Sequence, residues 1–149
     1  MKKLSIVILS FNVKTKLLAC LKSLPQHVDW EVTVVDNAST DGSAAIADIK
    51  NPVNIGFAAG NNVGIKKSTG QFVLLLNPDT IVYPNTIETI LKYMEEHPDV
   101  GAATCRVELP DGSLDYSCHR GFPTPWGALL HFLGLRSFSN YTSQNISNT

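Results

Sequence analysis

The sequence has no excess of either charge and few cysteines, and both features exclude classes of protein. Lys and Arg total 12 against 13 Asp and Glu, giving a net charge of -1, whereas proteins that bind nucleic acid usually carry a basic excess. We therefore expect no nucleic-acid partner. The three cysteines, Cys20, Cys105 and Cys118, form no C-x-x-C pair, which argues against a zinc knuckle or a dithiol redox motif. We interpret them as reduced thiols of a cytoplasmic protein.

Long apolar runs and several common catalytic motifs are also missing. No stretch reaches the roughly 18 apolar residues of a membrane span. The apolar run near the N-terminus stops at Ser10, too early and without the small-residue cleavage site of a signal peptide. The sequence contains no G-x-G-x-x-G fingerprint, no Walker P-loop and no G-x-S-x-G elbow, and its four histidines do not have metal-ligand spacing.

The remaining pattern is that of a globular chain in which strands alternate with helices. Its 149 residues, 44% of them hydrophobic, suit one domain with a core. Apolar runs predict strands over 4–9, 30–35, 53–55, 72–76 and 100–107. Helical spacing predicts helices after an Asn12 cap, over 44–49, after the glycines at 56–60, and from Asn85 with Glu88 in a capping box. Asp111-Gly112 indicates a hairpin turn. The alternation predicts an α/β fold with a mostly parallel sheet flanked by helices.

Polar segments follow four of the predicted strands, at residues 10–12, 36–39, 54–61 and 77–80. Ligands of open α/β sheets bind outside the carboxyl ends of the strands. A carboxylate at that position, such as Asp36, can accept the imide N–H of uracil or thymine, with Asn37 assisting. The alternative is that Asp36 closes a turn while Ser39 and Asp41 cap the next helix.

Glycines and asparagines dominate the third of these segments. Gly56, Gly60 and Gly64 allow the backbone to come close to a ligand or to another element. Helix packing alone would explain Gly60 and Gly64, but it does not explain Asn61 and Asn62, which are poor residues for a helix interior. Their amides would bond a nucleotide or hold the loop.

The fourth segment, "LLLNPDT", ends an apolar run on a carboxylate. Hard divalent cations prefer oxygen ligands, and Asn77 and Asp79 would present two oxygens from one side of a loop. N-P-D is also good sequence for a type I turn. On this segment alone, the turn is favoured.

Taken in order, these segments resemble the family-2 glycosyltransferases of the GT-A fold, and most closely rhamnosyltransferase-like members. The likeness is carried by "SIVILSFN", "VVDNASTDGS", "NIGFAAGNN", "LLLNPDT", and "LPDGSL" followed by "RGFPTP". It implies a Rossmann-like half that binds a UDP- or dTDP-linked sugar donor. It also implies Mg²⁺ or Mn²⁺ at a D-x-D-type motif, here Asn77-Pro78-Asp79, with Asp79 as main ligand and Asn77 as the weaker one.

The resemblance further implies that Asp36 reads the base and that an inverting transfer goes to a glycan or lipid-linked acceptor. The implied nucleotide-binding residues are Ser10, Phe11, Asn12, Asp36, Asn37, Asn54, Gly56, Phe57 and Asn61. Family members usually continue well beyond this length, into the part that carries the general base, for which no candidate is found here. We therefore expect a chain truncated after its donor-binding half, with a donor-binding domain over 1–120 and the start of a partly disordered acceptor-side region over 121–149.

Two further expectations follow. A non-catalytic nucleotide-sugar-binding module would show the same pocket without a base, and it is the alternative function. The apolar segment 126–135 would normally pack on the absent half, so we expect it to drive self-association or a peripheral contact with the inner face of the membrane.

Overall fold

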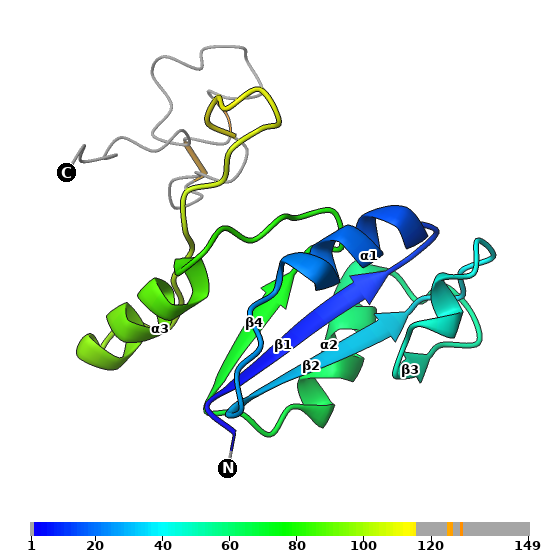
Figure 1. Cartoon of the computed structure of the whole chain (residues 1–149), viewed down its shortest axis with the longest axis horizontal. Coiled ribbons are helices and arrows are strands. Elements are labelled where there is room, and N and C mark those ends of the chain that lie inside the picture. Colours follow the sequence, from blue (N-terminus) through cyan, green and yellow to red (C-terminus); the bar gives the residue numbers. More distant parts are fainter. Residues whose placement is uncertain (1, 116–124, 127–128, 130–149) are drawn as a thin grey trace. The chain divides into compact units, whose positions relative to one another are not determined.

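The computed structural model describes residues 2–115, 125–126 and 129, and the chain divides into two compact units, Met1–Gly101 and Ala102–Thr149 (Figure 1). The predicted boundary after residue 120 lies within the second unit. The predicted acceptor-side region over 121–149 lies almost entirely outside the described residues. Among the residues that the structure describes, no helix has the length and apolarity needed to cross a membrane.

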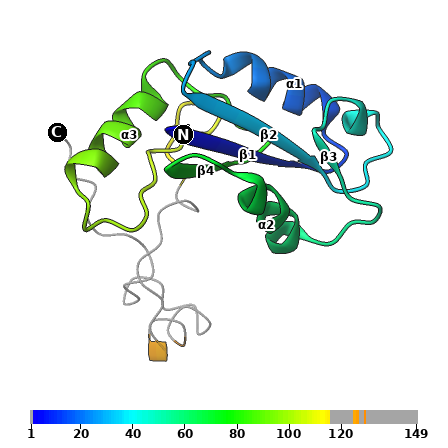
Figure 2. The same cartoon turned by 90° about the horizontal axis from the view of Figure 1, so that it is seen from below.

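The first unit is built on a parallel sheet of four strands in the order β3-β2-β1-β4. The strands are β1 (Leu4–Ser10), β2 (Trp30–Asp36), β3 (Ile49–Lys50) and β4 (Phe72–Leu76). The helices are α1 (Lys14–Ser23), the short 3₁₀ helix η1 (Ser43–Ala45), α2 (Phe57–Lys67) and α3 (Thr86–Glu96). Figure 2 shows α1 and α3 on one face of the sheet and α2 on the other. The predicted α/β fold with a parallel sheet flanked by helices is confirmed.

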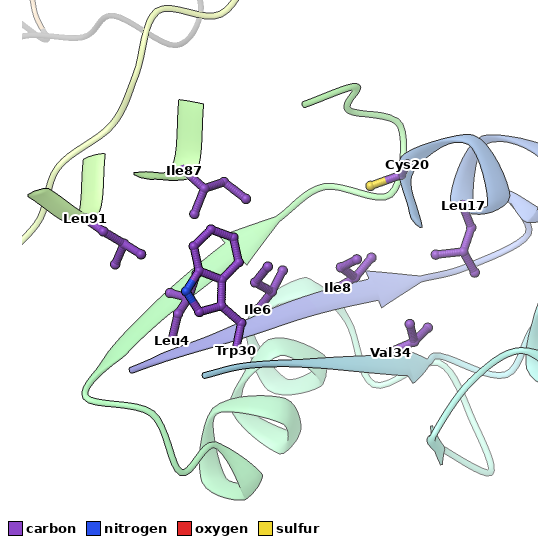
Figure 3. Packing of buried hydrophobic residues seen from close by; sticks show 9 residues of the cluster. All are labelled: Leu4, Ile6, Ile8, Leu17, Cys20, Trp30, Val34, Ile87 and Leu91. Carbon is purple, nitrogen blue, oxygen red and sulfur yellow. The ribbon is translucent and has the colours of Figure 1, made fainter. Parts of the chain in front are cut away.

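β1 lies at the centre of the sheet and is buried along its whole length. Alternate side chains of a strand point to opposite faces, so an apolar run with no polar alternation marks a strand covered on both sides. On the face of α1 and α3, β1 contributes to a core of nine buried residues (Figure 3): Leu4, Ile6, Ile8, Leu17, Cys20, Trp30, Val34, Ile87 and Leu91.

On the opposite face, α2 lies against β1 through two glycines. A Cβ atom added to Gly64 would lie 2.3 Å from Cγ1 of Val7, and one added to Gly60 would lie 2.6 Å from Cδ1 of Leu9. No real Cβ contact is that short, so only hydrogen fits between this helix and the sheet. Helix packing therefore accounts for both glycines.

Two of the predicted elements near residue 50 are wrong. The third strand is Ile49–Lys50 rather than 53–55, and the predicted helix over 44–49 is limited to η1. Asp48, the residue before β3, already lies alongside β2. Its N–H donates to the carbonyl of Val34, and its carboxylate accepts the N–H of Val34. Pro52 then follows the short strand, and a proline has no N–H to continue a ladder.

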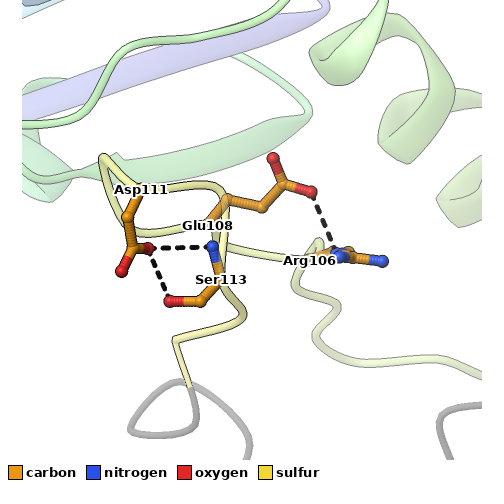
Figure 4. A network of polar contacts seen from close by, with 4 residues as sticks. All are labelled: Arg106, Glu108, Asp111 and Ser113. Carbon is orange, nitrogen blue, oxygen red and sulfur yellow. Dashed lines mark hydrogen bonds and ion pairs between the residues drawn. The ribbon is translucent and has the colours of Figure 1, made fainter.

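The predicted strand over 100–107 is also wrong, since this range contains no strand. Its residues are mostly exposed, and they have no neighbouring strand in the described part of the chain. The hairpin that follows is confirmed, because Glu108 and Leu114 form an antiparallel bridge around Gly112, whose φ is +81°. Figure 4 shows Asp111 accepting hydrogen bonds from the N–H and hydroxyl of Ser113.

Both predicted asparagine caps differ from the structure. Val13, not Asn12, is the residue before α1, and Asn12 has a left-handed φ of 53°. Asn85 does precede α3, but its φ is 65° and its side chain makes no capping hydrogen bond, so no capping box with Glu88 forms. A side-chain cap usually needs extended backbone at that residue, which explains the difference.

We expect Gly64→Ala to lower the free energy of unfolding by about 1–2 kcal/mol, because overpacking costs about 1–3 kcal/mol and the better helix propensity of Ala returns up to about 1 kcal/mol. Urea denaturation followed by circular dichroism measures this. Gly101→Ala is the matched control, since a Cβ there would meet no atom within 4 Å. Equal stability of the two variants would contradict the packing described for α2.

Candidate functional site

The loops that follow β1 and β2 are joined by side chain to backbone hydrogen bonds. The hydroxyl of Ser39 accepts the N–H of Asn12 at 2.9 Å, and the Asn12 side-chain oxygen accepts the N–H of Thr40 at 2.8 Å. One carboxylate oxygen of Asp41 accepts the N–H of Lys14 at 2.8 Å. The first turn of α1 is thus capped by a residue from the neighbouring loop, and the two loops form one edge.

The second oxygen of Asp41 accepts both the N–H and the hydroxyl of Ser43, where η1 begins. The hydrogen bond from the Ser43 hydroxyl, followed by that from the Lys14 N–H, lowers the pKa of Asp41 below its ordinary value. The predicted capping by Asp41 is confirmed. Ser39, which was expected to share it, bonds Asn12 instead.

The buried side chain of Asn37 holds the loop that precedes α2. Its Nδ2 donates to the Asn54 side-chain oxygen at 2.7 Å, and its Oδ1 accepts the N–H of Ile55 at 3.1 Å. Asn51 donates to the same Oδ1 at 3.2 Å, and Asn54 in turn accepts the N–H of Gly56 at 2.9 Å. Both polar atoms of Asn37 and the side-chain oxygen of Asn54 therefore bond other parts of the protein and fix the shape of this loop.

Asp36 and Ser10 are register partners at the ends of β2 and β1, so their side chains lie next to each other on one face. Asp36 is 1% exposed, and its Oδ2 accepts the N–H of Ser39 at 2.9 Å. Its Oδ1 and the Ser10 hydroxyl are both buried without a hydrogen-bond partner in the described part of the chain. Leaving a buried carboxylate oxygen unpaired is costly. A donor at this strand end, whether the adjacent Ser10 hydroxyl or a ligand, would satisfy this oxygen.

A hollow of about 360 Å³ opens at the same edge of the sheet. Residues from four segments line it: Leu9, Phe11, Val13, Asn37, Asn54, Gly56, Phe57 and Pro78. Phe11 and Phe57 are both exposed, at 44% and 66%. A larger hollow of about 480 Å³ lies beside Trp30, at the amino end of β2, and none of the predicted site residues lines it. The structure thus brings five predicted residues and the turn at Pro78 to one place.

The other predicted nucleotide-binding residues, Ser10, Asn12, Asp36 and Asn61, are not among those that line this hollow. Asn61 is buried in α2, and its Nδ2 donates to the carbonyl of Phe57 one turn earlier at 3.0 Å. The predicted roles of this amide were to bond a nucleotide or to hold the loop, whereas its hydrogen bond lies within α2 itself.

The turn after β4 presents Asp79 to solvent. The side chain of Asp79 is 53% exposed, and its Oδ2 lies 3.8 Å from the ammonium nitrogen of Lys16. No group of three or more His, Cys, Asp or Glu side chains able to hold a metal ion occurs among the described residues. This single exposed carboxylate therefore fits a cation that takes one protein ligand and obtains the others from phosphates and water. The exposed Asn77 adds an amide oxygen two residues away.

Contacts from α1 to this turn were not predicted from the sequence. The thiol of Cys20 donates to the carbonyl of Asn77 at 3.7 Å. Burial, and to a lesser degree the nearby carboxylate of Asp79, raise the pKa of Cys20 to about 11, so the thiol keeps the proton that it donates. The sequence holds one signal for these contacts. Lys16 and Cys20 are four residues apart, so they lie on the same side of a helix, and that helix begins at the candidate edge.

A sequence profile described as Glycosyl transferase family 2 matches residues 5–147. A Haemophilus influenzae protein named an uncharacterized glycosyltransferase is 33% identical over 106 residues, which are 65% of this chain and 36% of that protein. The Staphylococcus aureus poly(ribitol-phosphate) β-N-acetylglucosaminyltransferase TarS is 27% identical over 112 residues, 65% of this chain and 20% of TarS. The chain thus spans about a third or less of the length of these two relatives.

Solved structures of S. aureus TarS share the fold. The structure of TarS residues 1–349 has a TM-score of 0.58 and 25% identity, over 64% of this chain and 33% of the TarS chain. The same TarS fragment in complex with UDP-GlcNAc has a TM-score of 0.57 and 25% identity, over 64% of this chain and 32% of that one. The predicted GT-A fold is confirmed by these similarities.

We expect Asn37→Ala to lower the free energy of unfolding by about 2 kcal/mol, because it removes the hydrogen bonds that the buried Asn37 side chain makes with the 51–56 loop, each worth about 0.5–1.5 kcal/mol. Urea denaturation checks this value. Asn62→Ala is the matched control, since Asn62 is an exposed residue of α2 at which alanine favours the helix. Equal stability of the two variants would remove the structural role assigned to Asn37.

Proposed function

Since this chain belongs to glycosyl transferase family 2, we propose that it binds the nucleotide of a sugar donor and takes part in transferring the sugar to a glycan or lipid-linked acceptor. The observation that carries the proposal is the unpaired, buried Oδ1 of Asp36 at the edge of the sheet where the hollow opens. This oxygen requires a hydrogen-bond donor, and the imide of a pyrimidine base provides one.

Uracil and thymine both fit this requirement, and we propose a UDP- or dTDP-linked donor. Each base has an N3–H group that a carboxylate can accept, and each has flat faces that pack against aromatic rings. Phe11 and Phe57, two exposed residues that line the hollow, supply such rings. Guanine also has a ring N–H next to a carbonyl, so GDP belongs in the test. Ser10 and Asn12 belong to the same edge.

Mg²⁺ or Mn²⁺ is the proposed cofactor, with Asp79 as main ligand and Asn77 as the weaker one. When bound, such a cation stabilises the negative charge that develops on the diphosphate as the sugar leaves. The half-exposed carboxylate of Asp79 is open to solvent on one side, which is what a cation with most of its ligands from phosphates and water requires.

We propose an inverting reaction and a rhamnosyltransferase-like donor preference, both on the strength of the sequence resemblance. An inverting transfer needs a general base. Asp111 is unsuited to that role, because the hydroxyl and N–H of Ser113 lower the pKa of its carboxyl group. With its base unassigned, the chain also fits the alternative function, a module that binds nucleotide sugars without turnover. Measuring transfer and hydrolysis besides binding separates the two.

We expect UDP and dTDP to bind at least about tenfold more tightly than CDP, because a hydrogen bond to a charged group contributes about 1.5–3 kcal/mol and cytosine has an acceptor where uracil has N3–H. Calorimetry with Mn²⁺ measures these three affinities and that of GDP. Asp36→Asn should abolish the preference for UDP, whereas Asp29→Asn, at an exposed position, should keep it. Equal binding of UDP and CDP by the wild type would contradict the role of Asp36.

We expect Asp79→Ala to remove most of the increase in UDP affinity that Mn²⁺ gives, because the cation loses its main protein ligand. The measurement is UDP binding with Mn²⁺ and with EDTA. Asp99→Ala, which removes another exposed carboxylate, is the control. If Asp79→Ala kept the full effect of Mn²⁺, the metal assignment would fail.

A further inference from the structure

Two residues of α1 hold the loop that follows β4. The thiol of Cys20 donates to the carbonyl of Asn77, and the hydroxyl of Ser23 accepts the N–H of Val82 at 3.0 Å. Ser23 also donates to the carbonyl of Cys20 at 2.7 Å, which orients its hydroxyl. Backbone groups near both ends of the 77–82 loop are therefore fixed to one helix.

Lys16 lies one turn before Cys20 on the same side of α1. Its ammonium nitrogen is 3.8 Å from Oδ2 of Asp79, the carboxylate proposed to bind the metal. The contacts of Cys20 and Ser23 fix the backbone of the loop relative to α1. Lys16 and Asp79 are therefore close because the elements that carry them are held together. The lysine side chain is still 64% exposed, so its ammonium is free to turn toward a bound ligand.

We infer that Lys16 contacts the diphosphate of the nucleotide donor, an assignment that rests on the proposed function. Asp79 would hold a cation that also binds phosphate oxygens, so the diphosphate would lie close to this carboxylate, and the ammonium nitrogen of Lys16 is 3.8 Å from its Oδ2. Hydrogen bonds between an ammonium and phosphate oxygens are charge-assisted and strong. Without a nucleotide, Lys16 neutralises Asp79 and competes with the metal ion for it.

Removing the charge of Lys16 distinguishes a lysine that only pairs with Asp79 from one that contacts the diphosphate, because the two predict different changes in UDP affinity. An exposed ion pair contributes little to stability, about 0–1 kcal/mol, so a lysine that merely paired with Asp79 would leave nucleotide binding unchanged or improve it by freeing the metal site. A lysine that contacts the diphosphate behaves differently. Its loss strengthens the binding of Mn²⁺ alone and weakens the binding of UDP.

The test is Lys16→Met, which keeps the length of the side chain and removes its charge. Titration of Mn²⁺ alone, followed by electron paramagnetic resonance, should show affinity about threefold higher or more, since one nearby positive charge is removed. Calorimetry at saturating Mn²⁺ should show UDP affinity about tenfold lower, since a charge-assisted hydrogen bond is lost. Lys16→Arg should keep UDP binding, and Lys22→Met, at an exposed lysine in the last turn of α1, should change neither value.

The outcomes are distinguishable. If the wild type bound UDP and Lys16→Met left that affinity unchanged or raised it, the inference on Lys16 would be overturned and the proposed function would stand. If the wild type bound neither UDP nor dTDP, the proposed function would fail and this assignment with it. Thermal melting of each variant confirms that the comparison is made between folded proteins.

Discussion

Burial of β1 on both faces of the sheet governs where the other elements of the first unit lie. Its residues pack against α1 and α3 on one side and against α2 on the other. Parallel pairing in register with β2 and β4 then brings the ends of all three strands to one edge. The loops that follow these strands meet there because the strands do, and the hollow lined by Phe11, Asn37 and Pro78 is the consequence.

The sequence predicts the three long strands of the sheet well and its short edge strand badly. β1, β2 and β4 agree with the predicted ranges to within one residue, because burial demands unbroken apolar runs. β3 has only two residues. The residue before it, Asp48, is held by hydrogen bonds of its backbone and carboxylate with Val34, and the pattern of apolar residues does not predict such bonds. The apolar residues over 100–107 satisfied the pattern, but the described part of the chain offers them no neighbouring strand.

For the candidate site, the sequence predicts where the site lies but not the role of each residue in it. Four polar segments were expected at one edge, and four line the hollow. An asparagine amide both donates and accepts, so it bonds backbone as readily as a ligand, and spacing does not distinguish the two for Asn37 or Asn61. Lys16 was not singled out from the sequence, because its contact depends on a loop more than 60 residues later that α1 holds in position.

The three carboxylates at this edge differ in how far the protein already satisfies them. Asp41 accepts hydrogen bonds on both oxygens, and its lowered pKa reflects them. Asp36 has one oxygen engaged and one buried without a hydrogen-bond partner among the described residues. Asp79 has a lysine on one side and solvent on the other. A carboxylate whose two oxygens both accept hydrogen bonds from the protein serves the fold, whereas an oxygen without such a bond is suited to a neutral donor and a solvent-exposed carboxylate is suited to a hydrated cation. This difference in hydrogen bonding, more than position in the sequence, separates the structural Asp41 from the two carboxylates proposed to read the base and to bind the metal.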